Sequence, residues 1–217
     1  QPRSRGATAG GRIGMTITTE LILGGQKSGK SRRAELLARD WLAQSADHRA
    51  VLIATGEAWD DEMRERIARH QRDRAQRVPG LRTHEDARAL GDKLLALSLP
   101  HRMVLVDCLT LWLTHRLMPP PGLAPQPPHA TQDEVNRLCQ AIACASGPVV
   151  LVGNEIGLGV IPLGREVRAF VDALGRLNQD VAATCQRVPR RSIRLNRTGP
   201  KPIENTSARM PTQRPTM

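Results

Sequence analysis

The residues with the clearest chemical meaning lie near the start of the chain, in the segment GGQKSGKS at positions 24–31. This segment matches the pattern G-x-x-x-x-G-K-S, whose glycines let backbone N–H groups turn inward around phosphate oxygens, beside the positive end of a helix. Lys30 is expected to reach the terminal phosphates, and the Ser31 hydroxyl is expected to bind Mg²⁺. The segment therefore predicts a P-loop that holds a nucleoside triphosphate. The residues predicted to line it are Gly24, Gly25, Gln26, Lys27, Ser28, Gly29, Lys30 and Ser31.

A second candidate is Asp107, which ends the apolar run RMVLVD. In an open α/β sheet, the carboxyl ends of the strands face the ligand crevice. A carboxylate at that edge suits Mg²⁺, either directly or through water, so Ser31 and Asp107 are the predicted metal ligands. Glu85, Asn154 and Glu155 lie at the carboxyl ends of predicted strands, and each fits either the lining of a site or a helix cap.

A third candidate is His70, which lies in the charged segment DDEMRERIARHQRDR. In a helix, Arg66 and Arg74 fall on the same face as this histidine, one turn before and one turn after it. Cations at those positions would favour the neutral, nucleophilic imidazole. The same charges also form i,i+4 pairs, however, so the spacing alone favours a solvated helix without chemistry. The pairs in question are Glu62–Arg66, Glu65–Arg69, Arg69–Asp73 and Asp73–Arg77.

The elements that must position these residues alternate between strands and helices, which predicts an α/β domain at 15–186 with a mostly parallel sheet and helices on both faces. The predicted strands cover residues 16–25, 49–55, 81–85, 102–108 and 148–155. The predicted helices cover residues 31–46, 59–77, 87–99, 109–117, 133–145 and 164–185. Six prolines at 118–131 predict a surface loop there.

The composition narrows the class of protein. The 217 residues carry a net charge of +11, but the body at 15–186 holds 21 basic and 20 acidic residues. The excess charge therefore lies at the two ends, and a nucleic-acid-binding interpretation would depend on those ends alone. Aromatic residues make up only 2% of the chain, which argues against a surface that stacks on bases. The sequence shows neither an apolar run long enough for a membrane span nor a signal-peptide pattern at its start.

Both ends of the chain differ in composition from the body. Residues 1–14 are rich in glycine and arginine, so we expect a disordered leader, with Met15 as a hypothetical natural start. Residues 187–217 are basic and rich in proline, so we expect a disordered tail, with a short edge strand at 192–196 as the alternative. The cysteines have neither zinc-type nor redox-type spacing, which favours four reduced core thiols in a cytoplasmic protein. They are Cys108, Cys139, Cys144 and Cys185.

Taken together, several segments resemble successive blocks of one family, the bifunctional adenosylcobinamide kinases/adenosylcobinamide-phosphate guanylyltransferases of cobalamin biosynthesis. The blocks run in order from about Leu21 to Asn178 and so cover most of the chain. They are GGQKSGKSRRAE, IAT, DDEMRERIARHQRDR, RTHE, VDCLTLWLT, VGNEIGLGVIP and GRLNQ. The P-loop alone would name only a superfamily, whereas its combination with the histidine segment and with NEIGLGVIP is far more specific.

The resemblance implies a homotrimeric P-loop enzyme with two activities. From the composition, we expect neither a nucleic-acid partner nor a membrane span. The enzyme would phosphorylate adenosylcobinamide with ATP or GTP, and then transfer GMP from GTP to that phosphate with release of pyrophosphate. The family's second reaction passes through a guanylylated histidine, and the matching position is His70, with neighbouring arginines stabilising the developing charge. Glu85 and Asp107 match acidic nucleotide-contacting positions. The other matching nucleotide contacts are Ala54, Thr55, Gly56, Gln71, Arg72, Asp73 and Arg74.

The chain departs from the family pattern after the GRLNQ helix, where an apolar strand is usual and the basic tail stands instead. A reading-frame change near Arg187 and true divergence are both hypotheses for this difference, and losing a strand would expose the edge of its neighbour. Three other functions stay open on the sequence: a small-molecule kinase without guanylyl transfer, a nucleic-acid-binding ATPase that uses the basic ends, and a folded but inactive relic.

Overall fold

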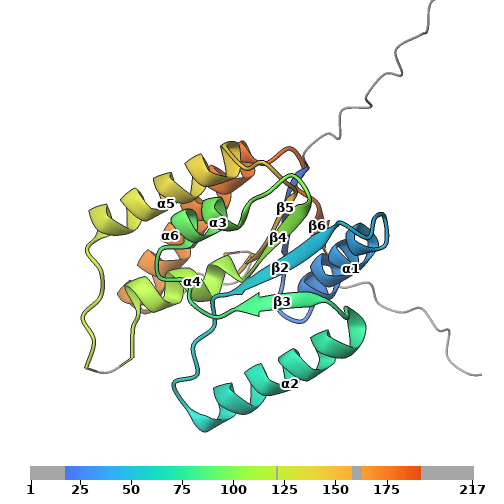
Figure 1. Ribbon diagram of the computed structural model, residues 1–217. Helices are drawn as coiled ribbons and strands as arrows, with labels where there is room; N and C mark the ends of the chain where they lie inside the picture. The colour runs from blue at the N-terminus through green and yellow to red at the C-terminus, as the bar shows by residue number, and fades with distance from the viewer. Residues whose placement is uncertain (1–17, 121, 158–162, 192–217) are drawn as a thin grey trace, which may run out of the picture.

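The computed structural model describes residues 18–120, 122–157 and 163–191. Its centre is a sheet of six parallel strands in the order β3–β2–β4–β5–β1–β6 (Figure 1). The strands are β1 (Thr19–Gly24), β2 (Arg49–Ala54), β3 (Leu81–His84), β4 (Arg102–Asp107), β5 (Val149–Asn154) and β6 (Arg190–Arg191). The helices are α1 (Lys30–Leu42), α2 (Asp61–Arg77), α3 (Leu90–Leu97), α4 (Leu109–Leu117), α5 (Pro128–Ala143) and α6 (Arg165–Thr184). The expected α/β fold is confirmed.

Two hydrophobic layers cover the two faces of the sheet. Successive strand residues point to opposite faces, so Val51 and Ile53 join one layer while Ala50 and Leu52 join the other. The first layer packs against α3, α4, α5 and α6, and the second packs against α1. In Figure 1, α2 lies beside the β3 edge of the sheet, and Arg77 in its last turn forms an ion pair with Glu35 of α1. The one buried residue of α2 is Arg74, and its apolar residues Met63, Ile67 and Ala68 are half-buried.

The proline-rich loop is shorter than predicted. The prediction placed it at 118–131, but α5 begins at Pro128, so residues 128–131 are helical. Proline is well suited to the first turn of a helix because the missing N–H would have no partner there. Thr131 and Val135 then extend the buried face of α5, which the proline content concealed.

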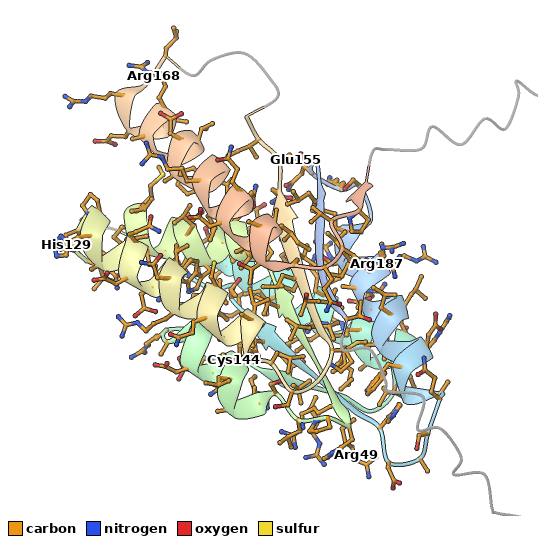
Figure 2. The ribbon with its side chains drawn as sticks, turned by 90° about the horizontal axis from the view of Figure 1, so that it is seen from above. Arg49, His129, Cys144, Glu155, Arg168 and Arg187 are labelled. Carbon is orange, nitrogen blue, oxygen red and sulfur yellow. The ribbon has the colours of Figure 1, made fainter. Side chains whose placement is uncertain are left out.

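The ordered body also extends beyond the predicted boundary at residue 187. Arg187 donates its backbone N–H to the Thr19 carbonyl at 3.1 Å and accepts from Leu21 N at 2.9 Å, and β6 follows in parallel with β1. Figure 2 shows Arg187 on the α1 side of the sheet, where its guanidinium lies 3.8 Å from buried Glu20. The predicted tail thus begins with a segment that pairs with β1. The predicted leader, Met15 and the alternative strand at 192–196 lie outside the described residues.

The cysteines differ from one another in exposure. All four are free thiols, but only Cys108 is buried, and Cys144 is exposed at the end of α5. The prediction of four core thiols is therefore wrong for Cys144, which follows the last buried turn of its helix. Among the described residues, the helices are too short or too polar to cross a membrane.

Candidate active site

The candidate site lies at the carboxyl edge of the sheet, where parallel strands bring their ends together. The P-loop follows β1, Thr55 follows β2, Glu85 follows β3 and Asp107 ends β4. Glu155, which follows β5, lies at the opposite end of the sheet from Arg49, at the start of β2 (Figure 2). One edge of the sheet thus collects the predicted nucleotide-binding segments of four strands.

The P-loop has the backbone expected of a phosphate cradle. Lys27 and Gly29 have φ angles of 55° and 83°, in the left-handed region, so the chain turns sharply before α1 begins at Lys30. The Lys30 side chain is buried, and its Nζ donates to the Gly25 carbonyl at 2.6 Å. Burial lowers the pKa of Lys30, while the charges of Asp107 and Glu155 oppose that shift. The ammonium is therefore held inside the loop, where phosphate oxygens would replace the carbonyl as its acceptor.

The two predicted metal ligands meet in the structure. Ser31 Oγ donates to Asp107 Oδ1 at 3.0 Å. A hydroxyl from α1 and a carboxylate from β4 therefore lie in contact next to the P-loop. Hard oxygen donors of this kind suit Mg²⁺, which keeps several waters and takes phosphate oxygens as its other ligands. The described residues hold no cluster of three or more His, Cys, Asp or Glu side chains that could bind a metal without a nucleotide. The donor set therefore fits a Mg²⁺–triphosphate complex.

The electrostatics of Asp107 also fit a cation. Burial raises the pKa of Asp107, whereas the hydrogen bond from Ser31 and the charges of Arg74 and His70 lower it. The negative charge of the Asp107 carboxylate is therefore only partly balanced by positive charge. The guanidinium of Arg74 lies beside it, with Nη2 at 3.9 Å from Oδ2. A divalent cation beside Ser31 would supply the missing positive charge.

The Thr55 side chain is buried at the end of β2 and is hydrogen-bonded within the protein. Its hydroxyl donates to the Cys108 carbonyl at 2.7 Å and accepts the Cys108 N–H at 2.7 Å, and the residue is 2% exposed. Thr55 N also donates to the Asp107 carbonyl at 3.0 Å. These contacts hold the chain after β4 against the chain after β2, so the Thr55 side chain positions Asp107. The neighbouring residues Ala54 and Gly56 are half-buried at the same edge.

His70 lies on the exposed surface of α2, in the middle of the helix. The helix begins at an Asp60 cap, whose carboxylate accepts from Met63 N at 2.6 Å, and it has acids in its first turn and bases in its last. This arrangement matches the helix dipole, as the sequence predicted. Of the four i,i+4 pairs that offered an alternative explanation of the charges, Asp73–Arg77 is observed, at 3.9 Å.

The residues that follow His70 divide into two groups. Gln71, Arg72 and Asp73 are exposed, and Gln71 Nε2 donates to Glu85 Oε1 at 2.6 Å, which ties α2 to the end of β3. Arg74 is buried and faces the body of the protein. The predicted nucleotide-contacting segment is therefore split, because an α-helix presents successive residues to different sides.

A cavity of about 410 Å³ opens beside Glu85. Its walls are Glu57, Glu85, Asp86 and Arg88, from the loops after β2 and β3. The backbone carbonyl of Arg88 accepts a hydrogen bond from Arg116, which is buried against Trp112. The sequence pattern pointed to Glu85 alone, because the other three walls come from loops without a motif.

Comparisons with known proteins agree with this geometry. The family described as cobinamide kinase / cobinamide phosphate guanyltransferase matches residues 20–190. The bifunctional adenosylcobalamin biosynthesis protein CobP of Pseudomonas aeruginosa is 44% identical over 170 residues, or 78% of this chain and 90% of that protein. The proteins of the same description named CobU in Escherichia coli and Salmonella typhimurium are each 35% identical over 175 residues, or 77% of this chain and 92% of theirs.

Proposed function

Because the chain belongs to the family of cobinamide kinases/cobinamide phosphate guanyltransferases, we propose that it phosphorylates adenosylcobinamide and then transfers GMP to the product through His70. The observation that carries this proposal is the arrangement of the site. A complete P-loop with its Ser31–Asp107 pair lies at the same sheet edge as the helix that carries an exposed histidine. The family match and the geometry support both reactions, whereas the P-loop alone would support only the first.

In the first reaction, the P-loop binds ATP or GTP, with backbone N–H groups and Lys30 on the phosphates. Ser31 and Asp107 would hold Mg²⁺, which neutralises phosphate charge when it is bound. The aminopropanol hydroxyl of adenosylcobinamide attacks the γ-phosphorus, the bond to the β-phosphate oxygen breaks, and the nucleoside diphosphate leaves. Lys30, held by burial inside the loop, stabilises the charge that develops on the transferred group.

In the second reaction, a neutral nitrogen of the His70 imidazole attacks the α-phosphorus of GTP, and pyrophosphate leaves. A phosphate oxygen of adenosylcobinamide phosphate then attacks the same phosphorus, the P–N bond breaks, and adenosylcobinamide-GDP is released. We expect Glu85, a wall of the neighbouring cavity, to contact the nucleotide from the β3 side. The exposed position of His70 leaves its ring accessible to a large corrinoid substrate.

The assembly and the location belong to the same proposal. The family resemblance supports a homotrimer, and the free thiols of the four cysteines are compatible with the reducing conditions of a cytoplasm. Apolar side chains are exposed on α6 and on the loop before it, among them Leu163 and Val167. We expect this surface to contribute to the contacts between subunits.

The proposal is tested by incubating the protein with GTP labelled at the α-phosphate and Mg²⁺, followed by detection of an acid-labile protein-bound label. We expect the label on the wild type and on His101→Ala, because His101 is exposed at the opposite, amino edge of the sheet. We expect no label on His70→Ala. Label that persists on His70→Ala would remove the proposed nucleophile, and phosphorylated product without any label on the wild type would leave the kinase activity alone.

A further inference from the structure

We propose that Glu35 is a positioning residue for guanylyl transfer: through Arg74, it holds the helix of His70 against the Ser31–Asp107 pocket. The inference depends on the proposed guanylylation of His70. Glu35 ends the block GGQKSGKSRRAE, but the resemblance assigned it no role. It lies on the face of α1 that also buries Ala34 and Ala38.

The carboxylate of Glu35 lies beside two arginines of α2, with a hydrogen bond from Arg77 and an ion pair with Arg74. Oε1 lies 3.5 Å from Arg74 Nε, and Oε2 accepts from Arg77 Nε at 2.7 Å. Only 3% of the Glu35 side chain and 8% of the Arg74 side chain are exposed, so the first of these ion pairs is largely screened from water. A nucleotide would have to displace both arginines to reach this carboxylate, which excludes Glu35 as a direct ligand.

Arg74 connects this anchor to the site. Its Nη2 lies 3.9 Å from Asp107 Oδ2, and its Nη1 donates to Thr83 Oγ1 at 3.3 Å. One guanidinium therefore contacts α1, β3 and the end of β4. These contacts fix the position of α2 at Arg74. Because His70 lies one helical turn before Arg74 on the same helix, they also fix the position of its imidazole relative to Asp107.

The other described contacts of α2 with the body involve side chains that are half-buried or exposed, such as half-buried Ile67 near Gly56. Arg74 is the single buried residue among the seventeen of the helix. Gln71 adds a hydrogen bond to Glu85, but both of these side chains are exposed. Glu35 itself stands one turn after Ser31 in α1, so the same rigid helix carries a candidate metal ligand and the anchor of the nucleophile. Glu35, through Arg74 and Arg77, thus links the helix that follows the P-loop to the helix that carries His70.

The experiment compares Glu35→Gln with Glu20→Gln, a matched control. Glu20 is also 2% exposed and also lies beside two arginines, Arg33 at 2.9 Å and Arg187 at 3.8 Å, but it faces α1 and the β6 edge, away from α2. Two rates are measured on each folded variant: formation of the acid-labile guanylyl protein from labelled GTP, and phosphorylation of adenosylcobinamide.

We expect Glu35→Gln to slow guanylyl-protein formation about 10- to 100-fold relative to phosphorylation, since a shift of the nucleophile by about 1 Å can cost that much. Glu20→Gln should lower stability while leaving the ratio of the two rates within about twofold of wild type. Glu35→Asp, which keeps the charge on a shorter side chain, should give an intermediate ratio, and it decides the question if Glu35→Gln does not fold. An unchanged ratio in the folded Glu35 variants, or an equal change in Glu20→Gln, would overturn the inference. Absence of label on the wild-type protein would instead overturn the proposed function.

Discussion

The contacts of Thr55 give the sharpest prediction on stability. In Thr55→Val the side chain keeps its shape but loses the hydroxyl. The Cys108 N–H then loses the acceptor that it has at 2.7 Å, whereas the Cys108 carbonyl keeps the N–H of Trp112 at 3.1 Å. A buried N–H without an acceptor costs about 1–3 kcal/mol, and the lost hydroxyl donor costs about 1 kcal/mol more. We therefore expect the free energy of unfolding to fall by about 2–4 kcal/mol.

This prediction is measured by urea unfolding at constant pH, with the midpoint and slope fitted for each variant. Thr55→Ser keeps the hydroxyl and should lose only about 1 kcal/mol for one buried methyl group. Thr114→Val is a second control, because the Thr114 hydroxyl donates only to Thr110 O within α4, at 2.8 Å, and we expect a change below about 1 kcal/mol.

The opposite result has a clear meaning. If Thr55→Val unfolds at the wild-type urea concentration while its affinity for GTP falls, the hydroxyl contacts the nucleotide and the positioning role is wrong. If stability falls as expected, Asp107 loses its support, and Mg²⁺-dependent binding of GTP should weaken in the same variant.

The remaining predictions concern the reactivity of the cysteines, the pairing of the C-terminal segment with β1, and Glu85 in the wall of the cavity. Burial raises the pKa of Cys185 to about 12, so at pH 8 its thiolate is far scarcer than that of an ordinary cysteine. Iodoacetamide at that pH should label exposed Cys144 first, as peptide mass analysis would show. Equal labelling would contradict the burial. A chain ending at Cys185 loses four hydrogen bonds to β1 that a chain ending at Arg191 keeps. We expect its free energy of unfolding to be about 2–6 kcal/mol lower. Equal melting curves for the two chains would show that this pairing does not contribute to stability. Glu85→Ala should weaken GTP binding about 10- to 100-fold by calorimetry, with unchanged affinity speaking against a nucleotide contact.

The sequence was sufficient for most of the fold because its buried strands are nearly continuous apolar runs. The run RMVLVD identified both β4 and its terminal Asp107, and the P-loop pattern placed Ser31 where it meets that carboxylate. The boundary of α5 was missed since proline usually signals a loop, and only the buried face of the helix reveals the difference. Segment 187–191 was missed because its pairing with β1 uses backbone groups, which leave no mark in the composition.

The site was predictable to the extent that motifs specify it. Spacing identified the arginine one turn after His70, but it could not distinguish an arginine that faces phosphate from one that faces Glu35. The available signal was a glutamate on the apolar face of α1, since a buried carboxylate requires a cationic partner. The cavity walls Glu57 and Asp86 come from irregular loops, where local sequence does not determine direction.

The sheet order has a consequence for how the chain reaches its native state. The P-loop strand is among the first segments to be synthesised, yet its two neighbours, β5 and the segment that ends in β6, are among the last, with Thr19 pairing to Val149 and Leu23 to Arg190. Pairing across such separations closes very long loops, which slows folding. During translation, the backbone groups of β1 therefore lack their strand partners until the last part of the chain has been made. Nascent chains that stop before residue 149 should therefore depend on chaperones and be unable to retain a nucleotide.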